Sequence, residues 1–280
     1  MKIPLFYVDA FTSEVFKGNP AAMCMLESWL PDEILQSIAA EHNLSETAFI
    51  VKKDDVFQIK WFTPKAEAFL CGHATLATAH VLFKIYNYGS KPIRFESKSG
   101  ILSVTQASDG FITLDFPAYE LEPTGPLPNL AEILGVQYKE MYNAESRHLF
   151  VALNSEKEVL ELRPDFRSMS ELQHRSVLVS APGNQCDYVL RYFAPKVGVN
   201  EDPVTGSAQC SLIPYWSQRL NKKKLISRQL SERGGEIHGE LSADNRVRIS
   251  GNAIIYMQGT INISIKPQNT LIPFTFENKK

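Results

Sequence analysis

The sequence has little cysteine, no strong excess of charge and no long hydrophobic run, and each absence excludes a class of protein. Its 280 residues include 29 basic and 31 acidic side chains, a balance that gives no clustered basic face for nucleic acid. No stretch approaches the roughly 20 apolar residues that span a bilayer. The N-terminus turns polar at Asp9, unlike a signal peptide. We therefore expect a cytoplasmic protein without nucleic-acid or membrane partners.

The sequence also lacks the common signatures of a metal or nucleotide site. The P-loop, the dinucleotide-binding glycine motif and the nucleophile elbow are all missing. The four cysteines have no metal-ligand spacing and lie in apolar runs, at Cys24, Cys71, Cys186 and Cys210. In a reducing compartment they should be free thiols.

What the sequence does contain is a pair of similar stretches. One runs from Phe62-Thr63-Pro64-Lys65 to Cys71-Gly72-His73-Ala74-Thr75, and the other from Phe193-Ala194-Pro195-Lys196 to the segment 201–207. Phe62 and Phe193 are 131 positions apart, and so are Cys71 and Asp202. Each stretch then enters an apolar segment. This repeat indicates a duplicated unit, with polar side chains at the start of a buried helix in each copy.

Length and pattern together predict an α+β fold of two similar lobes in pseudo-two-fold relation. A chain of 280 residues, 44% hydrophobic and 21% charged, can form two domains with separate cores. The segment 74–83 has no polar face, which is typical of a helix wrapped by a curved sheet. We interpret the segment 208–219 as a second buried helix of this kind. The proline-rich segment 120–129 is the best linker. We place the lobes at 1–118 and 119–267, with 268–280 as a candidate to complete the first.

Three polar residues near the repeated stretches are candidates for chemistry. Glu46 precedes an apolar strand, His73 follows Gly72 at the first helix start, and Asp202 precedes the second. Helix starts offer free N–H groups to an anion, so two facing starts would suit a carboxylate substrate. Each residue also has an ordinary interpretation. Glu46 could be a surface carboxylate, His73 a histidine with local partners, and Asp202 or Thr205 a helix cap.

Two other chemistries are weaker alternatives. A racemase with two thiols needs a cysteine at both helix starts, but only Cys71 lies near one, and Asp202 stands at the other. A metal site of Glu46, Cys71, His73 and Asp202 is possible in ligand type, but the spacing matches no close-packed ligand motif, so we expect no metal. A carboxylate with a raised pKa, such as that of Glu46, could move a proton instead.

These motifs resemble the phenazine biosynthesis PhzF-like family, which has the diaminopimelate epimerase fold. The resemblance covers nearly the whole chain. It rests on motifs in the family's order, among them Gly18-Asn19-Pro20-Ala21, Ser45-Glu46-Thr47-Ala48, Cys71-Gly72-His73-Ala74-Thr75, Glu201-Asp202-Pro203-Val204-Thr205-Gly206-Ser207 and Ser231-Glu232-Arg233-Gly234-Gly235. Gln209 departs from the family, which commonly has histidine there.

The resemblance implies two lobes, each a curved, mostly antiparallel sheet around a central helix, with the site in the cleft between them. It also implies a homodimer without a cofactor, and an isomerase that moves a proton between carbons of a small carboxylate, with a cyclic dihydroaromatic acid as one candidate. The catalytic set carries over to Glu46, His73, Asp202 and Ser207. The expected substrate-binding residues are Asn19, Ser45, Gly72, Thr205 and Gly206.

Two further functions remain open on this scaffold. A catalytically silent ligand-binding or interaction protein would bind small carboxylates without exchanging their carbon-bound hydrogens. A racemase with Cys71 as one base would be inactivated by thiol alkylation and protected by its ligand. Fold resemblance alone does not fix the substrate.

Overall fold

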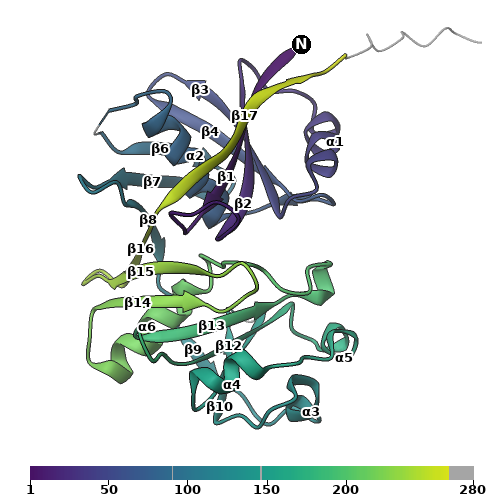
Figure 1. The fold of residues 1–280 in the computed structure, drawn as a ribbon, viewed down its shortest axis with the longest axis vertical. Helices are drawn as coiled ribbons and strands as arrows, with labels where there is room; N and C mark the ends of the chain where they lie inside the picture. The colour runs from purple at the N-terminus through teal and green to yellow at the C-terminus, as the bar shows by residue number, and fades with distance from the viewer. Residues whose placement is uncertain (90, 146, 265–280) are drawn as a thin grey trace, which may run out of the picture.

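The computed structural model describes residues 1–264 except residues 90 and 146, and it shows two lobes stacked along the long axis (Figure 1). All named strands join one continuous, strongly curved sheet. Most neighbouring strands are antiparallel, and the parallel pairs are β2–β3, β4–β6, β11–β12 and β13–β14. The α+β class and the two lobes with mostly antiparallel sheets are as the sequence predicted.

The N-terminal lobe curves its strands around one helix. Its strands are β1 (Lys2–Ala10), β2 (Asn19–Leu26), β3 (Glu46–Lys53), β4 (Val56–Phe62), β5 (Glu67–Ala68), β6 (Ile93–Ser97), β7 (Gly100–Gln106) and β8 (Ile112–Pro117). In β4 the apolar side chains of Phe57, Ile59 and Trp61 are buried, and the polar ones between them are half-buried. This period of two fits a strand with one face on a core. Helix α1 (Asp32–His42) covers the outer face with Leu35 and Ile38.

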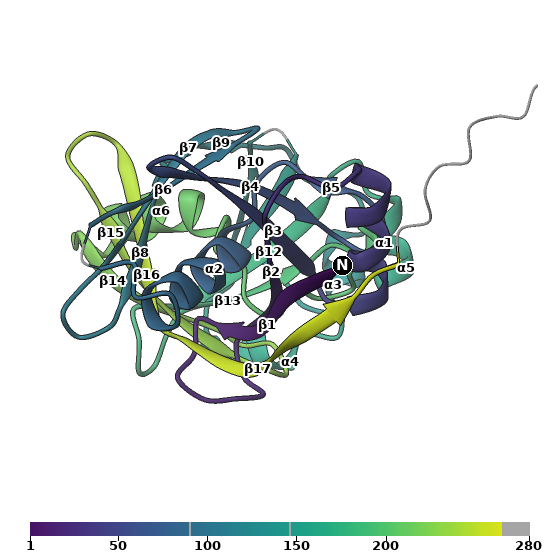
Figure 2. The ribbon, with the colours of Figure 1, turned by 90° about the horizontal axis from the view of Figure 1, so that it is seen from above.

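The central helix of this lobe is α2 (Gly72–Lys84), and all of its residues except His80 and Lys84 are buried. Figure 2 shows α2 inside the curve of the surrounding strands. Its small side chains, including Ala74, Ala77 and Ala79, let those strands approach closely. The prediction of an all-round buried helix at 74–83 is confirmed, with the helix beginning two residues earlier.

The C-terminal lobe repeats this plan. Its strands are β9 (Leu121–Pro123), β10 (Glu140–Ala144), β11 (His148–Ala152), β12 (Ser176–Pro182), β13 (Tyr188–Phe193), β14 (Lys224–Gln229), β15 (Gly235–Leu241) and β16 (Arg246–Gly251). Inside lies α6 (Gln209–Leu220), and the short helices are α3 (Leu130–Leu134), α4 (Glu156–Glu161), α5 (Phe166–Glu171) and the 3₁₀ turn η1 (Pro195–Val197). One apolar core contains residues of both α2 and α6, so the two lobes share a continuous interior.

The chain crosses between the lobes more than once. Strand β16 of the C-terminal lobe pairs with β8 of the N-terminal lobe. Strand β17 (Ala253–Asn262) then pairs with β1 along nearly its whole length. The chain thus returns to the N-terminal lobe at Ala253. This is earlier in the sequence than the segment 268–280, which we considered as the part that completes this lobe. That segment lies outside the described residues.

The helices do not provide a membrane span. Among residues 1–264, apart from positions 90 and 146, no helix is both long enough and apolar enough to cross a bilayer. This finding agrees with the absence of a long apolar run in the sequence.

The loop between β1 and β2 is fixed by a buried aromatic ring. Phe11 is 1% exposed and has a positive φ of 62°, a conformation that costs energy for a large side chain. Its N–H donates to the carbonyl of Asn252, and its ring lies against the backbone of Gly251 and Gly206. Both glycines leave room for the ring, so Phe11 holds the start of the loop between the lobes.

We predict that Gly251→Ala destabilises the protein. A Cβ on Gly251 would lie 2.6 Å from Cδ1 of Phe11, and the buried ring has little freedom to move. Such overpacking should lower the free energy of unfolding by about 1–3 kcal/mol, measured by urea denaturation. Gly259→Ala is the matched control, because a Cβ there meets no atom within 4 Å. Equal denaturation midpoints for the two variants would contradict this role of Phe11.

Candidate active site

The two repeated helix starts meet at the junction of the lobes. A Cβ built on Gly72 would lie 3.6 Å from the Cα of Gly206, and one on Gly206 would lie 3.7 Å from the Cα of Gly72. Both glycines are buried. A methyl group would just fill this space, and a larger side chain would force the two starts apart. The two starts are not identical, because α2 begins at Gly72 whereas Gly206 belongs to a turn before α6.

Glu46 lies beside the first helix start. It is the first residue of β3 and pairs with Ala21 of β2, so the sheet fixes its backbone. Its Oε2 lies 3.3 Å from Nε2 of His73, and Sγ of Cys71 lies 3.5 Å from Nδ1 of the same ring. The Glu46 side chain is 20% exposed to solvent, and the His73 side chain is 7% exposed. The site is thus nearly closed, with Glu46 as its more accessible group.

The surroundings keep Glu46 and His73 uncharged at neutral pH. Burial and, to a lesser extent, the negative charge of Asp202 raise the pKa of the Glu46 carboxyl to about 8, although a hydrogen bond with Cys71 and the charge of Arg175 oppose the shift. Burial lowers the pKa of His73 to about 3. Glu46 and His73 therefore do not form an ion pair near pH 7. They are a protonated carboxyl group and a neutral imidazole.

Asp202 belongs to the second helix start but does not cap α6. Its Oδ1 accepts a hydrogen bond from Nδ2 of Asn19 at 2.9 Å, and its Oδ2 accepts one from the hydroxyl of Thr205. The cap position of α6 is Ala208, with no side-chain capping bond. Burial raises the pKa of Asp202 to about 6, against the lowering effect of Thr205 and Asn19. At pH 7 it is mostly a carboxylate, and its charge acts on Glu46.

Asn19 holds the two lobes together at the site. It begins β2 in the N-terminal lobe and is fully buried. Besides Asp202, its Nδ2 donates to the carbonyl of Val204 at 2.9 Å. Gln229 supports the other side, since its Nε2 donates to the carbonyl of Asp202 and its Oε1 accepts from the N–H of Thr205. Asn19 and Thr205, expected to bind substrate, thus have a visible structural role in positioning Asp202.

The two predicted serines lie beside this network. Ser207 follows Gly206 in the turn before α6, and its side chain is exposed. Ser45 precedes Glu46 in a bend and is half-buried. The structure therefore brings Glu46 and His73 into contact and places Asp202 near enough for its charge to act on Glu46, with Ser45 next to Glu46 along the chain and Ser207 in the turn after Asp202. No side-chain bond from either serine to the other three is seen in the described residues.

Several residues near the site were not predicted from the sequence. Gln229 fixes the second helix start, Arg175 acts electrostatically on Glu46, and the backbone carbonyl of Tyr192 accepts from the N–H of Asp202 at 3.0 Å. No sequence motif marks Gln229 or Arg175. Gln209, where the family commonly has histidine, is fully buried and accepts a hydrogen bond from the hydroxyl of Tyr188.

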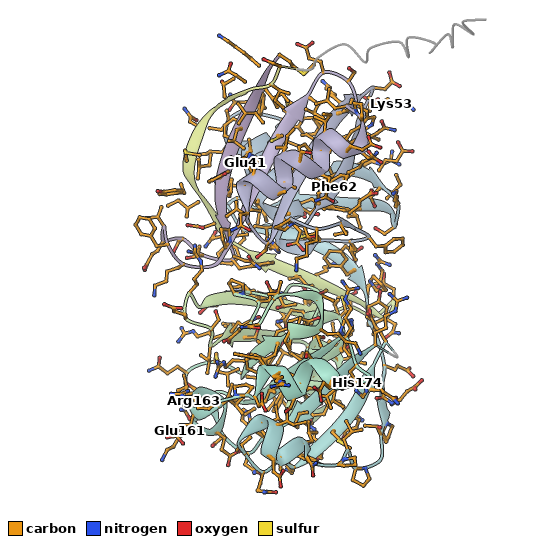
Figure 3. All side chains as sticks on the ribbon, turned by 90° about the vertical axis from the view of Figure 1, so that its right-hand side faces the viewer. Glu41, Lys53, Phe62, Glu161, Arg163 and His174 are labelled. Carbon is orange, nitrogen blue, oxygen red and sulfur yellow. The ribbon has the colours of Figure 1, made fainter. Side chains whose placement is uncertain are left out.

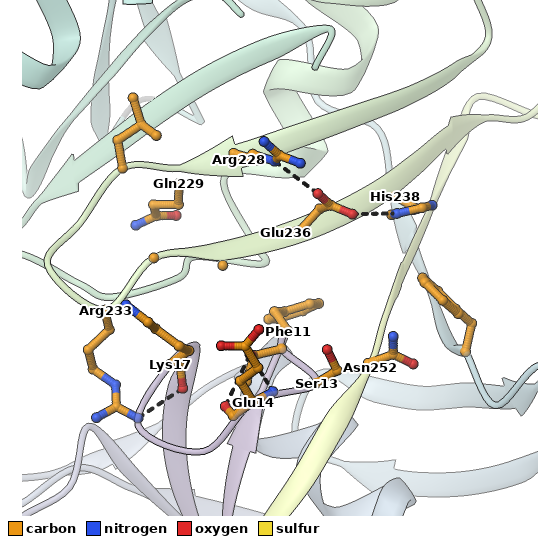
Figure 4. Close-up of a pocket in the computed structure, with 15 residues that line it drawn as sticks. Phe11, Ser13, Glu14, Lys17, Arg228, Gln229, Arg233, Glu236, His238 and Asn252 are labelled. Carbon is orange, nitrogen blue, oxygen red and sulfur yellow. Dashed lines mark hydrogen bonds and ion pairs between the residues drawn. The ribbon is translucent and has the colours of Figure 1, made fainter. Parts of the chain in front are cut away.

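A hollow lies elsewhere between the lobes. It has a volume of about 570 Å³ and is lined by the loop 11–17 and by strands β14 and β15 (Figure 4). Glu236 pairs there with Arg228 at 2.9 Å and contacts His238 at 3.0 Å. Glu46, His73 and Asp202 are not among its lining residues. Arg228 and Arg233 have acidic partners there, Glu236 and Asp9, whereas Glu14 and Lys17 form no ion pair among the described residues.

Known proteins resemble this chain in sequence, and a solved structure resembles it in fold. A Pseudomonas aeruginosa protein with the name uncharacterized isomerase is 48% identical over 264 residues, which cover 94% of this chain and 100% of the relative. The mouse phenazine biosynthesis-like domain-containing protein 1 is 42% identical, over 93% of this chain and 99% of its own. The crystal structure of a phenazine biosynthesis protein of the PhzF family from Enterococcus faecalis superposes with a TM-score of 0.90, at 45% identity, over 94% of this chain and 100% of that one.

A more distant neighbour shows the same fold. The structure of a hydroxyproline epimerase from Agrobacterium vitis superposes with a TM-score of 0.63 at 9% identity, over 93% of this chain and 92% of that one. The family model for phenazine biosynthesis-like proteins, PhzC-PhzF, matches residues 8–259. The chain therefore belongs to the PhzC-PhzF family of phenazine biosynthesis-like proteins and has their epimerase-like fold.

Proposed function

We propose that the protein is a cofactor-independent isomerase that moves a proton on a small carboxylate-bearing metabolite, with Glu46 as the base and then the acid. A cyclic dihydroaromatic acid is one candidate substrate. The observation that carries the proposal is the buried Glu46 carboxyl, whose pKa of about 8 lies near neutrality, beside two facing helix starts. The isomerase name of a relative and the epimerase neighbour support an isomerase-type reaction. The homodimer and the cytoplasmic location remain predictions.

The proposed reaction needs only groups that the chain supplies. With a pKa of about 8, roughly a tenth of Glu46 is deprotonated at pH 7, and this form can take a proton from a substrate carbon. The electron pair of the broken C–H bond moves into the conjugated carboxylate of the substrate. The protonated Glu46 then returns its proton to another carbon, so no proton is gained or lost overall. Free backbone N–H groups at the α2 start would stabilise the developing negative charge.

The neighbouring residues have distinct proposed roles. Asp202 keeps the pKa of Glu46 high and would orient a polar group of the substrate. His73 is neutral, so it would hold the substrate by hydrogen bonding rather than by charge. Ser207, exposed beside Gly206, would contact the substrate from the second lobe. Burial of Cys71 and the charge of Glu46 raise the pKa of its thiol, which makes a thiolate racemase the poorer alternative.

We predict that Glu46→Gln removes proton exchange with little change in folding. The amide preserves the shape of the carboxyl group but cannot accept the proton, so the rate should fall about 100- to 10,000-fold. The assay follows deuterium uptake at carbon by NMR in heavy water, with a panel of dihydro-hydroxyanthranilate analogues and other small cyclic carboxylates. Glu41→Gln is the control, because Glu41 lies exposed on α1 (Figure 3). Unchanged exchange in Glu46→Gln would refute the assignment, and ligand binding without exchange in the wild type would favour a silent binding protein.

We predict that the exchange rate rises with pH through about 8, because the active base is the deprotonated Glu46. Asp202→Asn removes a negative charge that raises the pKa of Glu46. The midpoint of the pH profile should therefore move to lower pH in this variant, whatever happens to the maximal rate. The profile is measured with a metal chelator present. A midpoint that stays in place or moves upward would show that Asp202 does not act on the titrating group.

A further inference from the structure

Three residues at the first helix start place different metal-ligand atoms close together. Glu46 offers a carboxylate oxygen, Cys71 a sulfur and His73 a ring nitrogen, and one such atom from each lies within 4.8 Å of the others. Oε2 of Glu46 lies 3.3 Å from Nε2 of His73, whereas Sγ of Cys71 lies 3.5 Å from Nδ1, the other ring nitrogen. In a tetrahedral zinc site, bond lengths of about 2.0–2.3 Å put ligand atoms roughly 3.3–3.8 Å apart. Because one ion binds only one of the two ring nitrogens, the thiol of Cys71 has to move from Nδ1 toward an ion at Nε2 for all three side chains to share it.

A second observation points to a ligand at the same place. The Nε2 atom of His73 is buried and makes no hydrogen bond to any described residue, although His73 is only 5% exposed. Its contact with Glu46 is close but poorly aligned. A buried polar atom without a partner carries an energetic cost, and buried polar atoms in proteins usually have a partner. A cation bound at this nitrogen would supply one.

We propose that Glu46, Cys71 and His73 form a binding site for a thiophilic divalent cation of the zinc type. A sulfur, an imidazole nitrogen and a carboxylate oxygen are the ligand set that Zn²⁺ favours in proteins. Sequence spacing gave no sign of this site, because Glu46 comes from β3 while the other two come from the α2 start. Asp202 is a poor fourth ligand, since both of its carboxylate oxygens accept hydrogen bonds from Asn19 and Thr205. The fourth position is left for water.

The bound cation acts as an inhibitor, and this part of the inference rests on the proposed function. A carboxylate coordinated to Zn²⁺ is no longer free to accept a proton from carbon, so the same ion that satisfies His73 stops the proton transfer. The binding itself depends only on the geometry of the three side chains. The two parts can therefore fail separately.

The binding test is calorimetric titration of the full chain with zinc chloride, after treatment with chelator and in the presence of reductant. We expect one zinc ion per chain at this site, and at least tenfold weaker binding in Cys71→Ser, which replaces a strong ligand by a weak one of similar size. Cys186→Ser is the matched control, because Cys186 is a partly exposed free thiol outside the site, and it should change the affinity less than twofold. Co²⁺ provides a second readout, since a bond to the thiolate of Cys71 gives a charge-transfer absorption that Cys71→Ser must lose.

Two results would overturn the site: no stoichiometric binding of zinc to the wild type, or equal binding by the wild type and Cys71→Ser. Loss of binding in Cys186→Ser instead would place the ion elsewhere. The inhibitory part is tested by adding zinc to the proton-exchange assay and reversing it with chelator. Bound zinc that leaves exchange unchanged contradicts inhibition. A protein that shows no exchange with any substrate, yet binds zinc through Cys71, contradicts the proposed function and leaves the site intact.

Discussion

The close approach of Gly72 and Gly206 is the constraint on which the rest of the site depends. Because neither residue has a side chain, two helix starts from different lobes touch backbone to backbone. The first start carries Cys71 and His73 and lies beside Glu46, and the second follows Asp202. Neither lobe holds the whole set. The shared core of α2 and α6, the β16–β8 pairing and the bond from Asn19 to Asp202 all keep the lobes in this arrangement.

Burial then determines the chemistry of these groups. It raises the pKa of Glu46 and of Asp202 but lowers that of His73, and the charge of Asp202 adds to the rise of the Glu46 pKa. Glu46 has the larger shift, since Asp202 has two hydrogen-bond donors that stabilise its charge. The result is one carboxylate that stays mostly ionised at neutral pH and one carboxyl group that is mostly protonated. Pairs of titratable groups with separated pKa values are typical of acid–base sites.

Much of this arrangement could be predicted from the sequence. The matched stretches indicated two lobes with polar helix starts, and the apolar segments at 74–83 and 208–219 are indeed the two central helices. Short elements were harder to predict. The helices α4 and α5 have only six residues each, too few to show a clear period, and they depend on capping by Ser155 and Asp165. Strand β17 contains Gly259 and stays continuous because it pairs with β1.

The partners of the site residues could not be predicted, since they come from distant parts of the chain. Asn19 meets Asp202 across 183 positions, and no local pattern encodes such a contact. In the sequence, Gln229 is an ordinary polar residue of a strand. Only in the fold does its side chain accept a hydrogen bond from the N–H of Thr205. Burial of Glu46 is similarly a property of the assembled lobes, so its raised pKa was available only as a hypothesis. The sequence indicated which residues to consider, and the fold determined their protonation.

The most direct test of this account is the titration of Glu46 itself. Carbon-13 NMR of protein labelled at the glutamate side-chain carboxyl groups can follow each carboxyl with pH, and Glu46→Gln identifies the signal. The account predicts a midpoint near 8 for Glu46, far above the ordinary value of 4.5. A midpoint near 4.5 would show a solvated carboxylate that is already ionised at neutral pH, and it would contradict the role of Glu46 as a buried proton carrier.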